Sequence, residues 1–152
     1  MICLKLLLMK DLKNPLFRFL EGTGNRQQSE YLMSEVRDFK DLKVWQKGMI
    51  IAEKCYVLTQ KFPKEEIYGM VQQIRRSATS IPANIAEGYG RRSTGDYVRF
   101  LNIAQGSINE LETHLILSAR VNLCNFNDIE SIIDELKQES KMIISLIKKL
   151  KS

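Results

Sequence analysis

The sequence offers one small group of residues that could perform acid–base or metal chemistry: Glu87, Glu110, Glu112 and His114. Glu110 and His114 are four residues apart, so on a helix they lie on the same face. A di-iron site in a helical bundle uses two Glu-x-x-His motifs and two further glutamates. This chain has a single histidine and no Glu-x-x-His motif. We therefore predict no metal site.

Other catalytic patterns are missing as well. No serine lies in a nucleophile-elbow motif, and neither a Walker motif nor a dinucleotide fingerprint is present. The sequence thus predicts a protein that is not an enzyme and binds no cofactor. Glu110 and Glu112 are expected to form ion pairs with basic residues of neighbouring helices, such as Arg75 or Arg76.

The basic residues are the better candidates for a binding site. Arg91 and Arg92 precede an expected helix, where an arginine pair and the free N–H groups of the helix can hold a phosphate together. Asp96, in the first turn of that helix, opposes this. The candidate nucleic-acid-binding residues are Arg91, Arg92, Arg75, Arg76, Lys43, Lys47 and Arg99. The alternative is that these charges are solvated or form ion pairs between helices.

The overall charge permits nucleic-acid binding without requiring it. The chain carries a net charge of +5, with a pI of about 9.1. Residues 37–100 hold twelve Lys and Arg against seven Asp and Glu, whereas residues 101–152 hold six against seven. The sequence therefore places the basic excess in the first half of the bundle.

Cys3, Cys55 and Cys124 show no CxxC spacing, which argues against a zinc site or a disulfide framework. Reduced thiols favour the cytoplasm. No run of apolar residues approaches the roughly 20 that a membrane-spanning helix needs, so no membrane association is expected.

Four segments show apolar residues spaced alternately by four and three, which places each set on one face of a helix. The sets are Val44, Gly48, Ile51, Cys55, Leu58 and Phe62; Ile67, Val71, Ile74, Ala78, Ile81 and Ile85; Tyr97, Leu101, Ala104, Ile108, Leu111 and Leu115; and Ile129, Ile133, Leu136, Ser140, Ile143, Ile147 and Leu150.

Breaks between these stripes set the helix limits. Pro63 is expected to end the first helix. Gly88 and Gly90 are expected to end the second. Ser93 with Asp96 is expected to cap the third, and Asn127 with Glu130 the fourth. The predicted helices span roughly 42–62, 65–88, 94–121 and 128–150. Because their loops are short, the fold class is all-α: an up-down antiparallel four-helix bundle over residues 37–152.

Pro82 lies inside the second stripe. It removes a backbone N–H and crowds the carbonyl of Ala78, which costs about 3 kcal/mol in an unbroken helix. Since the stripe continues to Ile85, a kinked second helix is predicted. The alternative is two shorter helices that meet at Ser80.

Several apolar residues lie off the stripes, including Trp45, Met49, Phe100 and Ile103. One explanation is that each helix of a four-helix monomer needs a wide apolar face. The other is that these residues form an interface of an oligomer.

Several motifs resemble those of the 23S rRNA-intervening sequence protein family, also called the four-helix-bundle protein family. The resemblance covers roughly residues 37–150. The motifs are Asp38 to Lys47 (DFKDLKVWQK), Phe62 to Glu66 (FPKEE), Tyr68-Gly69, Gln73 to Ala78 (QIRRSA), Ser80 to Arg91 (SIPANIAEGYGR), Tyr97, Arg99 to Leu101, Gly106-Ser107 and Glu110 to Glu112.

The resemblance implies an up-down bundle that assembles as a ring-like homopentamer, encoded within inserted sequences of bacterial large-subunit rRNA genes. A related branch is the accessory variability protein of diversity-generating retroelements, which binds a reverse transcriptase and nucleic acid and is, as a rule, more basic than this chain. Two hypotheses follow: an RNA- or DNA-binding accessory protein, or an oligomeric protein–protein interaction scaffold without nucleic-acid binding.

Residues 1–36 lie outside the resemblance and lack the stripe. We expect them to be an N-terminal extension, either disordered or the result of a start assigned too early, with Met33 as a natural start.

Overall fold

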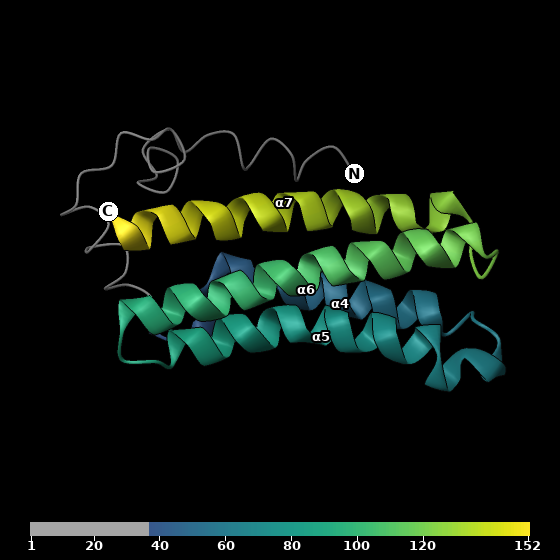
Figure 1. Cartoon of the computed structure of the whole chain (residues 1–152), viewed down its shortest axis with the longest axis horizontal. Coiled ribbons are helices and arrows are strands. Elements are labelled where there is room, and N and C mark those ends of the chain that lie inside the picture. Colours follow the sequence, from purple (N-terminus) through teal and green to yellow (C-terminus); the bar gives the residue numbers. More distant parts are fainter. Residues whose placement is uncertain (1–36) are drawn as a thin grey trace, which may run out of the picture. The chain divides into compact units, whose positions relative to one another are not determined.

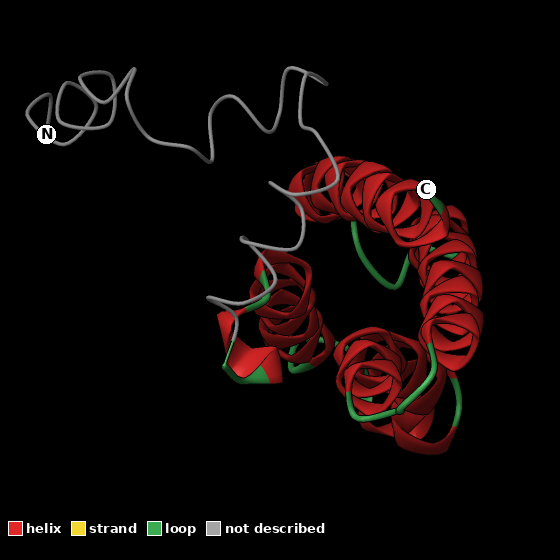
Figure 2. Cartoon of the chain, turned by 90° about the vertical axis from the view of Figure 1, so that its left-hand side faces the viewer, coloured by secondary structure: helices red, strands yellow, loops and turns green. Residues whose placement is uncertain are grey.

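A computed structural model describes residues 37–152, and the expected N-terminal extension over residues 1–36 lies outside this range. The described chain contains four long helices: α4 (Lys43–Thr59), α5 (Met70–Tyr89), α6 (Thr94–Arg120) and α7 (Phe126–Lys151). Short 3-10 helices, η1 (Phe39–Asp41) and η2 (Lys64–Tyr68), precede α4 and α5. Between residues 37 and 152 there is no strand (Figures 1 and 2), which confirms the all-α prediction.

Each long helix packs against the next one along the chain, and α7 also packs against α4. The contacts between neighbours run in opposite directions along the two helices. Lys47 meets Gln138 and Lys54 meets Glu135, which makes α4 and α7 antiparallel. The same order holds between α5 and α6, where the pairs are Arg76 with Glu110, Ser80 with Ser107, and Gly88 with Tyr97 and Phe100.

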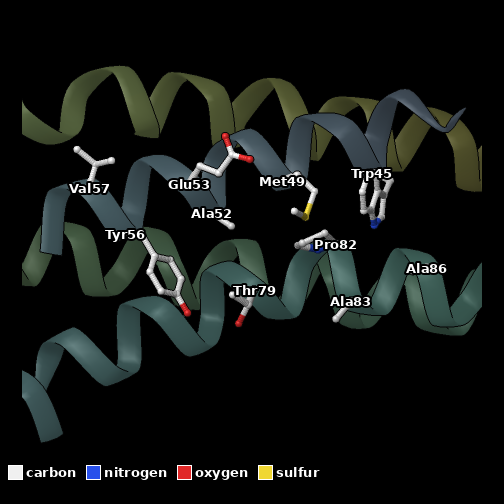
Figure 3. Close-up of a pocket in the computed structure, with 10 residues that line it drawn as sticks. All are labelled: Trp45, Met49, Ala52, Glu53, Tyr56, Val57, Thr79, Pro82, Ala83 and Ala86. Carbon is white, nitrogen blue, oxygen red and sulfur yellow. The ribbon is translucent and has the colours of Figure 1, made fainter. Parts of the chain in front are cut away.

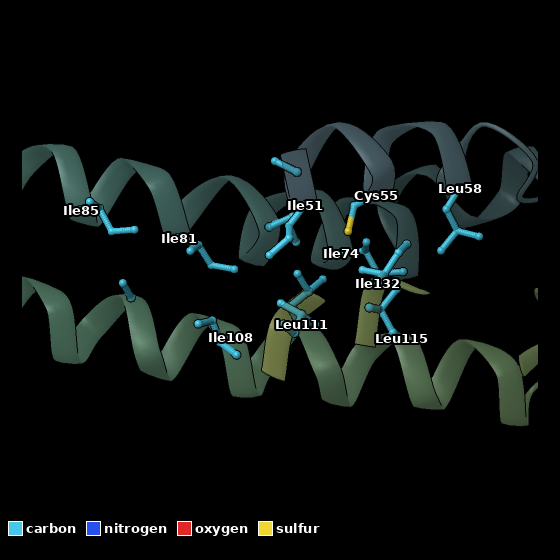
Figure 4. Packing of buried hydrophobic residues seen from close by; sticks show 14 of the residues in the cluster. Ile51, Cys55, Leu58, Ile74, Ile81, Ile85, Ile108, Leu111, Leu115 and Ile132 are labelled. Carbon is cyan, nitrogen blue, oxygen red and sulfur yellow. The ribbon is translucent and has the colours of Figure 1, made fainter. Parts of the chain in front are cut away.

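The predicted stripes form the core. All six stripe residues of α4 and its following loop are buried, as are all six of α6. Figure 4 shows part of this core, including Ile51, Ile108 and Leu111. The α5 stripe is buried except for Ile67, which lies in η2 and is 49% exposed. The prediction for Ile67 was wrong because the chain forms a separate 3-10 turn before α5 begins.

The α7 stripe was only partly correct. The buried residues of α7 are Ile129, Ile132, Leu136, Glu139 and Ile143. Ile133 and Ser140, which the stripe placed in the core, are only half-buried. Ile132 and Glu139, each one residue before a predicted position, are buried instead, so the carboxyl group of Glu139 lies in the interior.

The helix limits differ from prediction at two places. The first helix ends at Thr59 rather than 62, and Glu65 and Glu66 belong to η2 rather than to the first turn of α5. Glu66 nevertheless serves α5, since its Oε2 accepts a hydrogen bond of 3.0 Å from the backbone N–H of Met70. That bond satisfies one of the free donors at the helix N-terminus.

Helix caps follow the predicted principle but not always the predicted residues. Ser93 caps α6 as expected, accepting a bond of 3.1 Å from the N–H of Asp96. The cap of α7 is Asn125 with Asp128, not Asn127 with Glu130. Asn125 with Asp128 forms the cap because the backbone of Asn125 is extended (φ −90°, ψ 157°), as an N-cap requires.

Pro82 lies within one continuous helix, so the alternative of two helices meeting at Ser80 was wrong. The side-chain amide of Asn84 donates to the backbone carbonyl of Ser80 at 2.7 Å, which supports the backbone around the proline. Gly48 of α4 faces this point, because a Cβ there would lie 3.4 Å from Pro82 Cδ. The kink itself stays a prediction.

Gly88 sets the distance between α5 and α6. A Cβ at this position would lie 2.7 Å from Phe100 Cβ and 2.9 Å from Tyr97 Cδ2. We expect Gly88→Ala to lower the free energy of unfolding by about 2–3 kcal/mol, because the two helices must move apart. Urea denaturation measures this.

Gly106→Ala is the matched control on α6. A Cβ at Gly106 meets nothing within 4 Å, and alanine favours helix by about 1 kcal/mol over glycine. The control should be as stable as the parent or more so. Equal stabilities of the Gly88 variant and the parent would show that the contact relaxes without cost.

Candidate nucleic-acid interface

Arg91 and Arg92 lie in the turn between α5 and α6, immediately before the Ser93 cap. Arg91 forms an ion pair with Glu87, and its guanidinium lies over the ring of Phe100, 5.0 Å from the centroid. Arg92 is exposed and makes no ion pair with any of residues 37–152. Arg92 is therefore the more available of the two for an anionic ligand.

Arg99 joins this pair in space. Its guanidinium lies 5.9 Å from the centroid of the Phe100 ring, the same ring that Arg91 covers. The half-buried Phe100 thus holds two guanidinium groups near each other, through the attraction of cations to an aromatic face. Arg91, Arg92 and Arg99 form one basic cluster at the N-terminus of α6.

Arg75 and Arg76 are not part of that cluster. Arg76 is fifteen residues from Arg91 along α5, which corresponds to about 22 Å of helix. Arg75 turns to α4, where its Nε donates to Thr59 Oγ1 at 2.9 Å and its guanidinium lies 4.6 Å from the centre of the Tyr56 ring.

Arg76 turns to the opposite neighbour, α6, where it forms an ion pair of 3.1 Å with Glu110. This pair confirms the expectation for Glu110. Glu110 also lies 3.6 Å from Nε2 of His114. Both arginines therefore connect helices, which is the structural alternative that the sequence left open for them.

Lys43 and Lys47 lie in the first turns of α4. Lys43 is exposed, and its Nζ donates to Gln46 of the same helix at 3.3 Å. Lys47 is more enclosed, with 21% of its side chain exposed, and its Nζ lies 3.2 Å from Gln138 Oε1 and 3.8 Å from Glu135 Oε1. Lys47 lies at the inner border of the candidate interface.

The last turn of α7 supplies basic residues that the sequence analysis did not include. Lys148, Lys149 and Lys151 lie there, and Figure 1 shows the C-terminal end of α7 at the same end of the bundle as the α5–α6 turn and the start of α4. Helix direction was the available signal: in an up-down bundle the fourth helix ends where the first begins. We call this surface the basic end and define it by Lys43, Lys47, Arg91, Arg92, Arg99, Lys148, Lys149 and Lys151.

Acidic residues near the basic end are largely engaged by helix termini. Asp38 and Asp41 form the capping box of η1, and the Asp96 carboxylate accepts a bond of 2.7 Å from the hydroxyl of Ser93. The backbone N–H of Lys40 holds the pKa of Asp38 below its usual value. Glu87 is occupied by Arg91. These bonds partly compensate the acidic charges, so the lysines and arginines dominate the surface.

A second surface feature is an apolar groove between α4 and α5, with a volume of about 620 Å³ (Figure 3). Trp45, Met49 and Tyr56 come from α4, and Pro82 and Ala86 from α5. Two of the four residues that suggested an oligomer interface, Trp45 and Met49, therefore line this groove. Phe100 instead lies beneath Arg91 and Arg99 of the basic end, and Ile103 is 41% exposed on α6.

The described residues contain neither a metal-binding group of side chains nor a membrane-spanning helix. Residues 37–152 contain no group of three His, Cys, Asp or Glu that could hold a metal ion. None of the helices in this range is both apolar enough and long enough to cross a membrane.

The fold and its charged end place the protein among all-α four-helix bundles with a basic end. The sequence model of the 23S rRNA-intervening sequence protein family matches residues 40–145, and the chain belongs to that family. A crystal structure of a protein of unknown function from the S23 ribosomal protein family of Bacteroides thetaiotaomicron is similar, with 33% sequence identity and a TM-score of 0.62. The match covers 69% of this chain and 98% of that one. A comparison with curated proteins finds no match.

Proposed function

We propose that the protein is a non-enzymatic, oligomeric accessory protein of the cytoplasm that binds RNA through its basic end. The observation that carries this proposal is that cations from α4, α6, α7 and the α5–α6 turn lie at one end of the bundle.

Binding through the basic end should depend on phosphate more than on base. Lysine and arginine contacts to phosphates give affinity with little sequence preference. The nearby aromatic ring, Phe100, is already covered by Arg91 and Arg99, so stacking on bases should contribute little. The interface should therefore accept many RNA sequences, with an affinity that falls as salt rises.

Assembly would strengthen this binding. We propose a homo-oligomer, the ring-like pentamer that the family resemblance implies, with the α4–α5 groove as part of its interface. Its lining is mainly apolar, and burying apolar side chains is what drives most protein association. Five basic ends on one particle would bind a long RNA far more tightly than one, through effective concentration.

The double variant Arg91→Ala/Arg92→Ala tests the RNA-binding proposal. We expect it to weaken binding by about tenfold and to do so similarly for unrelated RNA sequences. The slope of log affinity against log salt should fall by about two per engaged chain, about one for each lost phosphate contact. Fluorescence anisotropy with labelled RNA, repeated at several salt concentrations, measures both.

Lys61→Ala/Lys64→Ala is the matched control. It removes the same charge from two exposed residues of the α4–α5 connection, at the opposite end of the bundle. The control should keep most of the parent's affinity. An arginine variant that binds as tightly as the parent at every salt concentration would exclude the basic end as the site.

The groove supports a second candidate function, that of a protein–protein scaffold. Its partner would be another protein, such as a reverse transcriptase, and the charges of the basic end would then serve solubility. A parent protein that binds neither RNA nor DNA even at low salt would favour this function over the first.

A further inference from the structure

Glu139 is an ionisable residue in the core of the bundle, and its carboxyl group has no hydrogen-bond partner among residues 37–152. It lies on the buried face of α7 and has no exposed surface. An ionised carboxylate that is buried without a partner is very unfavourable. The presence of a glutamate at this buried position therefore calls for a physical explanation.

The charge of Lys47 on α4, a member of the basic end, acts on Glu139 and favours its ionised form. Among residues 37–152, the Lys47 amine contacts Gln138 Oε1 at 3.2 Å and Glu135 Oε1 at 3.8 Å, from residues one and four positions before Glu139. Glu135 has a nearer partner, because Lys54 Nζ lies 2.7 Å from the same oxygen. The Lys47 amine is therefore loosely bound between the surface and Glu139.

The other neighbours of this part of α7 bring no competing charge. From α6, Gln105 donates to Ser140 Oγ at 2.8 Å, while its buried Oε1 has no hydrogen-bond partner in the described chain. From α4, Cys55 stays a neutral thiol, because burial, with a contribution from the charge of Glu135, raises its pKa to about 12. The ion pair of Glu110 on α6 faces α5, not α7.

We propose that Glu139 and Lys47 form a proton-controlled latch beneath the basic end. With Glu139 protonated, Lys47 points to the surface and its charge is available to a phosphate. When Glu139 loses its proton, the Lys47 amine turns inward and pairs with the buried carboxylate.

Two properties of the site support this latch. Burial raises the pKa of Glu139 to about 8, with the charge of Lys47 offsetting part of the rise, so the proton is lost near physiological pH rather than in acid. Once the carboxylate is ionised, pairing and hydrogen bonding are what make a buried charge tolerable. A flexible lysine stem can reach inward where a shorter side chain could not.

The consequence for the interface rests on the proposed function. RNA affinity measured at constant salt should fall by about fivefold between about pH 6 and about pH 9, the effect of one lost phosphate contact. Glu139→Gln, which cannot ionise, should bind tightly across this range. Lys47→Met should bind at the weaker level across the range, because it has no amine to offer at either pH.

Glu130→Gln is the control, since it removes the same charge from an exposed position of α7. It should keep the pH dependence of the parent, which separates the latch from a general effect of charge. A pH dependence that persists unchanged in both Glu139→Gln and Lys47→Met would overturn the proposal.

NMR of the Lys47 side chain in the full chain tests the latch without RNA. Its methylene and amine resonances should shift between about pH 6 and about pH 9 in the parent and stay constant in Glu139→Gln. A constant Lys47 signal in the parent would exclude the latch whatever the RNA result. A shift without any RNA binding would retain the latch and reject the proposed function.

Discussion

If the protein forms the proposed homo-oligomer, replacing Met49 with Asp should convert it into single chains at micromolar concentration. Met49 lines the apolar groove between α4 and α5 and is only half-buried within its own chain. The folded chain can therefore accept a charge there, with the carboxylate in water. An interface that covers the groove cannot, because burying an unpaired carboxylate costs far more than one subunit contact supplies.

Light scattering gives the mass of the particle, and circular dichroism shows whether the chain remains helical. The matched control is Gln72→Glu, which adds one negative charge at an exposed position of α5 outside the groove. We expect the control to assemble like the parent. If the Met49 variant keeps the mass of the parent, another face carries the assembly. A parent that already has the mass of one chain would refute the oligomer itself.

The core of three helices was accessible from the sequence because alternating spacings of three and four residues place side chains on one face of a helix. α4 and α6 follow this pattern through every residue of their stripes. The pattern was only partly correct on α7, where Ile129, Leu136 and Ile143 are buried as expected but Glu139 is buried in place of Ser140. Hydrophobicity alone cannot predict such a residue, since burial of a carboxyl group depends on neighbours from α4 and α6.

The candidate site, like the core, could be predicted from the sequence only in part. Position along the sequence correctly grouped Arg91, Arg92 and Arg99 near the start of α6, where the structure brings two of them to Phe100. Arg75 and Arg76 were candidates as well, but adjacent residues on a helix point about 100° apart. Each of these arginines contacts a different neighbouring helix. The lysines of α7 join the basic end only through the topology.

Glu139→Gln should make the protein more stable, and the gain should grow with pH. In the unfolded chain this carboxyl group ionises near its ordinary pKa of 4.5, whereas burial raises its pKa in the folded chain to about 8. Between these values the folded state binds more protons than the unfolded state. The free energy of unfolding of the parent therefore falls as pH rises from about 4.5 to about 8 and levels off above.

The glutamine variant lacks this loss, because its side chain carries no charge at any pH. Above about pH 8 it should exceed the parent by on the order of 5 kcal/mol, since each pKa unit corresponds to about 1.4 kcal/mol and the pKa of about 8 already includes the effect of the Lys47 charge. Near pH 4 the two proteins should differ little. Urea denaturation at a series of pH values measures the difference, with Glu130→Gln as the exposed control. A stability difference that is constant from acid to alkaline pH would mean that Glu139 ionises as readily in the folded chain as in the unfolded one.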